Sequence, residues 1–215
     1  MTHNWQAIFF DFDGVILDTT RIKTAAFAAM YAAHGAVVVD AVVAYHREHG
    51  GISRYIKLCH FEEEILHRPV SDERLEGLAK EFSRRVLEGV LSAPFVPGAE
   101  ATLRQVQQLG LPAFVVSGTP TEELTHVLRE RELEQFLAEI HGSPPLKPVI
   151  IRDILARHSF EPQRCLFFGD ALTDLYATRE TGLQFFAVEP PGEEHLFGPE
   201  VVVHSEVFLP CRESV

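Results

Sequence analysis

The segment Ile8–Thr19, which reads IFFDFDGVILDT, constrains the fold of this chain more than any other stretch. It opens with three apolar residues, which are typical of a buried strand, and then runs into Asp11 and Asp13. Successive strand side chains alternate between two faces, so these carboxylates point the same way. Like charges this close raise each other's pKa unless a cation or a hydrogen-bond donor lies between them. The pair therefore indicates a functional site, although Asp and Gly are also common in simple turns.

The residues that follow this segment carry helical patterns. From residue 23 to residue 34, apolar side chains recur at spacings of three and four, which places them on one helical face. Similar patterns continue, with a break at Gly50-Gly51, over residues 37–48, 52–67 and 72–91. No segment between residues 17 and 92 has a convincing strand pattern. We therefore predict a small all-α domain, residues 18–92, inserted after the first strand.

Beyond residue 93, helices and strands alternate. Pro94, Pro97 and Gly98 punctuate the chain and mark a return from the helical insert. Helical patterns then cover residues 99–110, 121–131, 148–158 and 171–181, and strand patterns cover residues 111–116, 165–169 and 184–188, with a candidate last strand at residues 201–203. This alternation predicts an α/β domain with a doubly wound parallel sheet, formed by residues 1–17 and 93–215. Ligands of such sheets bind at the carboxyl ends of the strands.

A candidate anion site follows the predicted strand that ends at Val116. Thr119 and Glu122 have the spacing of a capping box, and Pro120 suits the first helical position, so we predict a helix N-terminus here. Free backbone N–H groups and a hydroxyl beside the positive end of a helix favour an anion. A plain N-cap accounts for Thr119 but accounts less well for Ser117.

Lys147 is a candidate counter-ion at the start of another helix. Pro148 is expected to open the helix that runs to His158, which places Lys147 at the positive end of that helix. A cation is disfavoured there unless an anion lies beside it. Either Lys147 binds an anion, or it is a solvated surface side chain.

Two further carboxylates follow the predicted strand that ends at Gly169. Asp170 alone would be explained as an N-cap, but Asp174 lies one helical turn later on the same face. With Asp11 and Asp13, they form a set of four carboxylates at neighbouring strand ends. Such a set requires a hard divalent cation, and Mg²⁺ prefers oxygen ligands. We therefore predict Mg²⁺ as the cofactor.

These four segments resemble, in their order and spacing, the motifs of the haloacid dehalogenase superfamily of magnesium-dependent hydrolases. The matching residues are DFDGVILDT at 11–19, Ser117, Lys147-Pro148 and GDALTD at 169–174. The resemblance is to the phosphatase branch, which includes phosphoglycolate phosphatases and β-phosphoglucomutases. It implies a Rossmann-like core, and it identifies residues 18–92 with the family's α-helical cap.

The resemblance also implies a role for each motif residue. Asp11 would be the nucleophile that forms an aspartyl-phosphate, and Asp13 would be the general acid and base. Both would bind the metal, Asp13 through its backbone carbonyl. The remaining roles would be metal binding by Asp170, an outer position for Asp174, and phosphate binding by Ser117, Gly118 and Lys147, of which Lys147 would also balance the charge of the nucleophile.

Asp13 separates the possible reactions, because dehalogenase and phosphonatase branches generally lack an acid two residues after the nucleophile. Attack by a carboxylate splits hydrolysis into two steps, in which Asp13 first protonates the leaving oxygen and then activates water. We predict a phosphatase that acts on a small phosphorylated metabolite. The alternatives are a sugar-phosphate mutase and a non-catalytic binding or regulatory protein of the same fold.

Specificity is expected to come from the helical cap, which would exclude water when it closes. Side chains beside Gly50-Gly51 are candidates to reach the site, although this segment also fits a solvated helix junction. We predict that Arg54 binds the part of the substrate that does not react, because a guanidinium holds an anion bidentately. Lys57 is a second cationic candidate.

Composition narrows the partners. The chain has 19 Lys and Arg against 31 Asp and Glu, a formal net charge of −12, which argues against nucleic acid. No apolar run approaches the roughly 18 to 20 residues that a membrane span needs, and the first residues lack a signal-peptide pattern, so we expect a cytoplasmic protein. Cys59, Cys165 and Cys211 are scattered and fit reduced thiols. A monomer and a homodimer both remain open.

Overall fold

The sheet consists of six parallel strands, and the computed structural model describes residues 4–189 and 196–211. Across the sheet, the order is β3 (Glu139–Ser143), β2 (Ala113–Pro120), β1 (Ala7–Phe10), β4 (Cys165–Gly169), β5 (Gln184–Val188) and β6 (Val203–His204). The central strand β1 is buried along its whole length, because it is covered on both faces. Helices α5 and α6 belong to the core on one face, and α7 and α8 to the other. The predicted doubly wound parallel sheet is confirmed.

The four helices of this domain lie between strands in the chain. They are α5 (Ala99–Gln108), α6 (Thr121–Glu130), α7 (Lys147–His158) and α8 (Leu172–Thr181). Phe9 and Phe114 stack on the face covered by α7, with ring centroids 5.0 Å apart, and Phe10 and Phe168 stack on the opposite face at 4.9 Å. The alternation along β1 therefore sends one apolar set into each layer.

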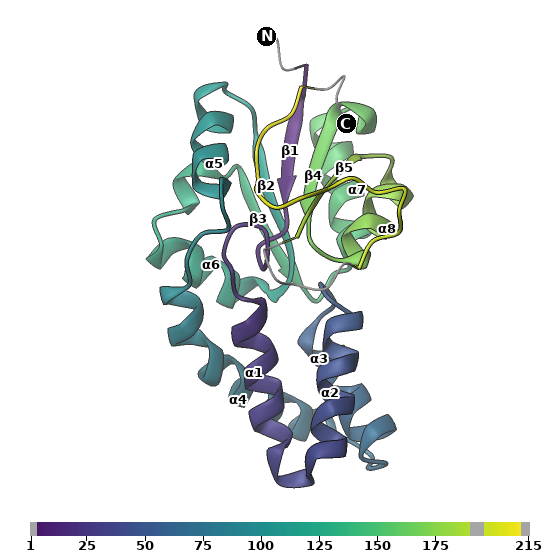
Figure 1. Cartoon of the computed structure of the whole chain (residues 1–215). Coiled ribbons are helices and arrows are strands. Elements are labelled where there is room, and N and C mark those ends of the chain that lie inside the picture. The colour runs from purple at the N-terminus through teal and green to yellow at the C-terminus, as the bar shows by residue number, and fades with distance from the viewer. Residues whose placement is uncertain (1–3, 190–195, 212–215) are drawn as a thin grey trace.

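The insert after β1 is helical, as predicted, and extends from one end of the α/β domain (Figure 1). Its main helices are α1 (Thr20–Tyr31), α2 (Ala36–Glu48), α3 (Arg54–His60) and α4 (Asp72–Ser92), with a π-helical turn at Phe61–Ile65 after α3. Phe27 contacts the rings of Phe82 and Phe61, at centroid distances of 4.1 and 5.3 Å. These rings pack within the insert and belong to the same apolar cluster as the sheet face covered by α5 and α6.

Three local predictions differ from the structure. Helix α6 begins at Thr121 with Pro120 as its N-cap residue, so the predicted N-cap at Thr119 is wrong. The chain from Ser117 to Pro120 instead continues β2, and a register irregularity separates its two contacts with β3. Strand β3 was not predicted, because its sequence EIHGS is polar and lies at the sheet edge. The last strand begins at Val203 rather than Val201.

The segment that leads from the insert back to the α/β domain is held in place by contacts with Val207. Val207 N donates to Pro97 O at 2.8 Å, and its carbonyl accepts a hydrogen bond from the Thr102 hydroxyl at 3.0 Å. Gly98 has a φ of 78°, and a Cβ there would lie 2.1 Å from the same carbonyl oxygen. Only glycine allows this approach without displacing backbone.

We expect Gly98→Ala to lower the free energy of unfolding by about 1–3 kcal/mol more than Gly110→Ala does. Both glycines have positive φ, 78° and 65°, but no atom lies within 4 Å of a Cβ at Gly110. Urea unfolding followed by circular dichroism measures the difference. Equal losses would mean that the contact with Val207 does not constrain the linker.

Candidate active site

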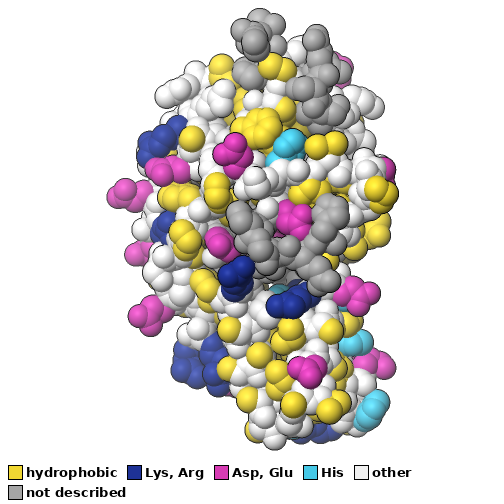
Figure 2. All heavy atoms as spheres, in the orientation of Figure 1, with side chains coloured by type: hydrophobic (Ala, Val, Ile, Leu, Met, Phe, Trp, Pro, Cys, Tyr) yellow, Lys and Arg dark blue, Asp and Glu magenta, His cyan; other side chains and the backbone are white. Residues whose placement is uncertain are grey.

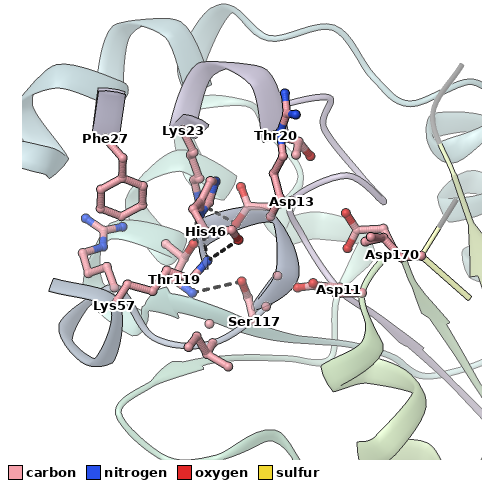
Figure 3. A pocket seen from close by; sticks show the side chains of 18 of the residues that line it. Asp11, Asp13, Thr20, Lys23, Phe27, His46, Lys57, Ser117, Thr119 and Asp170 are labelled. Carbon is pink, nitrogen blue, oxygen red and sulfur yellow. Dashed lines mark hydrogen bonds and ion pairs between the residues drawn. The ribbon is translucent and has the colours of Figure 1, made fainter. Parts of the chain in front are cut away.

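The candidate site lies where β1, β2 and β4 end. Phe10 is paired with Val115 of β2 and Phe168 of β4, so the residues that follow these three positions emerge at the same sheet edge. Asp11 comes first after β1, and its N–H donates to Phe168 O at 2.9 Å. Figure 3 shows Asp11 with Ser117 on one side and Asp170 on the other. The register therefore gathers the predicted residues.

Lys147 connects two carboxylates from different strand ends. Its Nζ lies 2.9 Å from Asp11 Oδ2 and 2.5 Å from Asp174 Oδ1, and all three side chains are buried. Burial opposes the charge on Lys147, but Asp11 and Asp174 outweigh it and raise the pKa of Lys147. Lys147 is the first residue of α7, one position before Pro148. The structure thus places Lys147 beside two carboxylates at the start of this helix.

Three acids form the group best suited to a cation. Asp11, Asp170 and Asp174 each offer an oxygen, and these atoms all lie within 4.8 Å of one another. Burial, together with the charges of Asp174 and Asp13, raises the pKa of Asp11 to about 7, although Lys147 opposes this rise. Burial and the charge of Asp11 raise the pKa of Asp170. One lysine thus offsets only part of the negative charge, and the all-oxygen donor set fits a hard divalent cation.

The carboxylate of Asp13 accepts hydrogen bonds from three side chains. The hydroxyl of Thr19 donates to it at 2.5 Å, Lys23 Nζ at 2.5 Å and the hydroxyl of Thr119 at 2.9 Å. Burial opposes the charge of Asp13, but Lys23 and the hydroxyls lower its pKa. Lys23 also donates to Thr119 at 2.8 Å. In this conformation Asp13 is a carboxylate that is fixed beside the pocket (Figure 3).

The sequence interpretation missed Lys23 and Thr119 as contacts of Asp13. Lys23 precedes Phe27 by four residues, so the two share a helix face, and that face is buried. The position of a lysine on the apolar face of an amphipathic helix could have indicated that Lys23 has a buried partner. No sequence feature indicated that Thr119 contacts Asp13, because a helix N-cap already accounted for Thr119.

Ser117 and Gly118 line the pocket beside Asp11, as their motif predicted. The Ser117 hydroxyl is buried and accepts a hydrogen bond from Thr119 N at 3.1 Å. A Cβ at Gly118 would lie 2.3 Å from the carbonyl oxygen of Gly51. Gly118 therefore leaves room for the insert to approach the strand ends.

The Gly50-Gly51 break is the point where the insert meets the core. Gly50 O accepts a hydrogen bond from the Thr173 hydroxyl at 2.7 Å. Gly51 has a φ of 76°, and a Cβ there would lie 2.2 Å from the same hydroxyl oxygen. Contacts with Gly118 and Thr173 place this turn between the end of β2 and the first turn of α8. The insert covers the pocket in this structure.

Arg54 lines the pocket, but its guanidinium is bound to the core domain. NH1 and NH2 donate to the two carboxylate oxygens of Glu123 at 2.8 and 2.6 Å, and NH1 also donates to the Ser83 hydroxyl at 2.5 Å. Burial opposes the charge of Glu123, and Arg54 outweighs it and lowers the pKa of Glu123. Since Glu123 lies in α6 and Arg54 in α3, this pair joins the insert to the core.

Comparison with known proteins gives the family. A sequence model described as haloacid dehalogenase-like hydrolase matches residues 5–182, so the chain belongs to this family. N-acetylmuramic acid 6-phosphate phosphatase of Pseudomonas aeruginosa is 27% identical over 212 residues, 92% of this chain and 90% of that protein. Phosphoglycolate phosphatase 1 of the same species is 22% identical over 220 residues, 96% of this chain and 79% of that protein.

Solved structures support the same fold. β-Phosphoglucomutase from Clostridium difficile matches with a TM-score of 0.71 at 20% identity, over 86% of this chain and 85% of that one. CbbY from Rhodobacter sphaeroides, solved in complex with phosphate, matches with a TM-score of 0.71 at 18% identity, over 94% of each chain. The predicted resemblance to this superfamily and its phosphatase branch is confirmed, and the protein is an enzyme of the hydrolase class. Within the described residues, no helix is both long and apolar enough to cross a membrane.

We expect Lys147→Met to lower the free energy of unfolding by about 3–5 kcal/mol at neutral pH, because it leaves buried carboxylates without their cation. Lys80→Met in α4 is the control, since that side chain is 75% exposed and its loss should change stability by less than about 0.5 kcal/mol. Urea unfolding without added divalent cations measures both. A Lys147→Met protein as stable as the wild type would show that the acids do not depend on this lysine.

Proposed function

We propose that this protein is a Mg²⁺-dependent phosphatase that hydrolyses a small phosphorylated metabolite through an aspartyl-phosphate on Asp11. The observation that carries the proposal is the position of Asp11, which contacts Lys147 at 2.9 Å and shares one pocket with Asp13 and Ser117. The names of both Pseudomonas relatives also support it, since each denotes a phosphatase for an acid that carries a phosphate ester.

Each residue has a definite part in this reaction. Asp11 attacks phosphorus, and Lys147 offsets the negative charge of both the nucleophile and the phosphoryl group. Ser117 and the backbone at Gly118 bind the phosphoryl oxygens. Asp13, which is a carboxylate in this structure, would take up a proton when substrate binds and give it to the leaving oxygen; the regenerated carboxylate would then remove a proton from the water that attacks the phosphoryl group. Lys23, Thr19 and Thr119 keep Asp13 in place for the second step.

The acids near Asp11 support Mg²⁺ as the cofactor. Asp11 and Asp170 would hold it, as the motifs predict, and Asp174 lies close enough to support or join them. When bound, Mg²⁺ supplies positive charge that lets the carboxylate and the phosphate, both anions, come together. Burial and the charges of Asp174 and Asp13 raise the pKa of Asp11 to about 7, and a cation beside Asp11 would favour its charged form.

The pocket favours a small substrate over the alternatives. Its volume is about 100 Å³, and a single water needs roughly 10–15 Å³ of such space. It therefore suits a small ester better than the sugar bisphosphate that a mutase would have to hold. The complete set of acids, Ser117 and Lys147 argues against a purely binding role.

Lys and Arg are interspersed with acidic side chains on the face shown in Figure 2, which supports the absence of a nucleic-acid partner. A cytoplasmic location and a monomer or homodimer stay predictions.

We expect a chelator to abolish phosphate release from p-nitrophenyl phosphate, and Mg²⁺ to restore it. Asp11→Asn should lower the rate by at least about a thousand-fold while leaving the circular dichroism spectrum unchanged. Asp40→Asn, on an exposed position of α2, is the matched control and should keep full activity. Full activity after chelation would reject the metal, and an active Asp11→Asn protein would reject the nucleophile.

Asp13→Asn should slow an alkyl phosphate more than p-nitrophenyl phosphate, because only the poorer leaving group needs protonation. Single-turnover rates of the first step on the two substrates test this. If both rates fall by the same factor, Asp13 serves the metal or the structure, and proton transfer to the leaving group must come from elsewhere.

Arg54→Met and Glu123→Gln should each lower kcat/KM by about ten-fold, and the double variant should lose little more than either single variant. Because Glu123 already binds the guanidinium, we expect a metabolite and p-nitrophenyl phosphate to be affected alike. Steady-state kinetics on both substrates decide the role of Arg54. If p-nitrophenyl phosphate is spared, Arg54 binds the non-reacting part of the substrate, as the sequence analysis predicts.

A further inference from the structure

Buried cations line the pocket or contact its lining residues, and nearly all of them have a carboxylate partner. Lys147 pairs with Asp11 and Asp174, Lys23 pairs with Asp13, and Arg54 pairs with Glu123. Lys57 also lines the pocket and is only 4% exposed. Among residues 4–189 and 196–211, no carboxylate lies within ion-pair distance of Lys57. This lysine is therefore the exception.

The partners of Lys57 are neutral. Its Nζ lies 2.8 Å from Nδ1 of His46 and 3.3 Å from the carbonyl oxygen of the same residue. Burial and the charge of Lys57 lower the pKa of His46, so the imidazole is neutral and its Nδ1 accepts the hydrogen bond. A charged amine has three protons, and these two contacts use two of them. One N–H remains for a ligand in the pocket.

The surroundings make an anion favourable at this position. Burial lowers the pKa of Lys57 to about 7, and Lys23 adds to the effect by repulsion. A ligand with a negative charge beside the amine would relieve both costs. Figure 3 shows Lys57 on the opposite side of the pocket from Asp11 and Asp170, with Ser117 and Thr119 between them. A substrate whose phosphate lies at Asp11 would extend towards Lys57.

We propose that Lys57 binds a carboxylate of the substrate, so that the preferred substrates are small phosphate monoesters that carry a carboxylate a few bonds from phosphorus. This inference rests on the proposed function and adds the substrate class. A carboxylate carries one negative charge, which matches the one amine that lacks an acidic partner. A second phosphate brings more charge, a hydroxyl brings none, and a cavity of about 100 Å³ limits the length of the substrate.

Binding of two non-hydrolysable phosphonates tests the proposal without turnover. 3-Phosphonopropionate has the carboxylate, and propylphosphonate has a methyl group in its place. In the presence of Mg²⁺, calorimetry should show that the wild type binds 3-phosphonopropionate roughly ten- to a hundred-fold more tightly than propylphosphonate. This is the usual effect of one charge-assisted hydrogen bond. Lys57→Met should bring the two affinities close together by weakening only 3-phosphonopropionate, and Lys57→Arg should keep most of the difference.

Controls separate this role from a structural one. Lys80→Met, at an exposed position of α4, should retain the full difference in affinity between the two phosphonates. Lys57→Gln replaces Lys57→Met if the latter does not fold. The proposal is overturned if the wild type does not prefer 3-phosphonopropionate, if Lys57→Met weakens both phosphonates equally, or if it weakens neither.

Hydrolysis of a matched pair of esters provides an independent readout. Phosphoglycolate should be preferred over 2-hydroxyethyl phosphate, and Lys57→Met should remove that preference by lowering kcat/KM for phosphoglycolate alone. If the phosphonates behave as expected but neither ester is hydrolysed, the proposed phosphatase activity fails and the carboxylate site stands. Hydrolysis of both esters at equal kcat/KM, with no difference between the phosphonates, overturns the carboxylate site alone.

Discussion

The contact of Lys147 with Asp11 and Asp174 is the interaction on which the candidate site depends. Three carboxylates gather where β1 and β4 end, and one oxygen of each lies within 4.8 Å of the other two. Lys147 enters from the first turn of α7, where a cation is disfavoured by the helix dipole and is stable only because the acids lie beside it. The proposed role of Asp11 as nucleophile depends on the same balance of charges.

The helical insert completes this site by close backbone approach. Gly51 and Gly118 lie close together where the insert meets β2. A Cβ at Gly118 would displace the backbone of Gly51, and a Cβ at Gly51 would displace the side chain of Thr173. Arg54 and Glu123 hold the two domains together beside that contact. The resulting pocket is small and lined by groups from both domains, which is the arrangement that the proposed selection of substrates by Lys57 requires.

The sequence predicted the part of the site that depends on strand ends and left out the part that depends on packing. Asp11, Asp170 and Lys147 follow or precede elements with clear patterns, so their convergence could be inferred from the topology of an α/β sheet. Lys23 and His46 lie inside the insert helices α1 and α2, and only the tertiary arrangement brings them to the pocket. The Arg54 partner was equally inaccessible, since Glu123 is 69 residues away in sequence. Strand β3 was missed because an edge strand need not be apolar.

The proposed mechanism requires that phosphate transfers to Asp11 before water removes it. Mass spectrometry of the acid-quenched Asp13→Asn protein tests it directly, because loss of the general base should slow hydrolysis of the intermediate and let it accumulate. With p-nitrophenyl phosphate and Mg²⁺, we expect an added phosphoryl group on the peptide that contains Asp11. Release of nitrophenol in a single turnover with no phosphorylated peptide, or with the phosphoryl group on another residue, would contradict it.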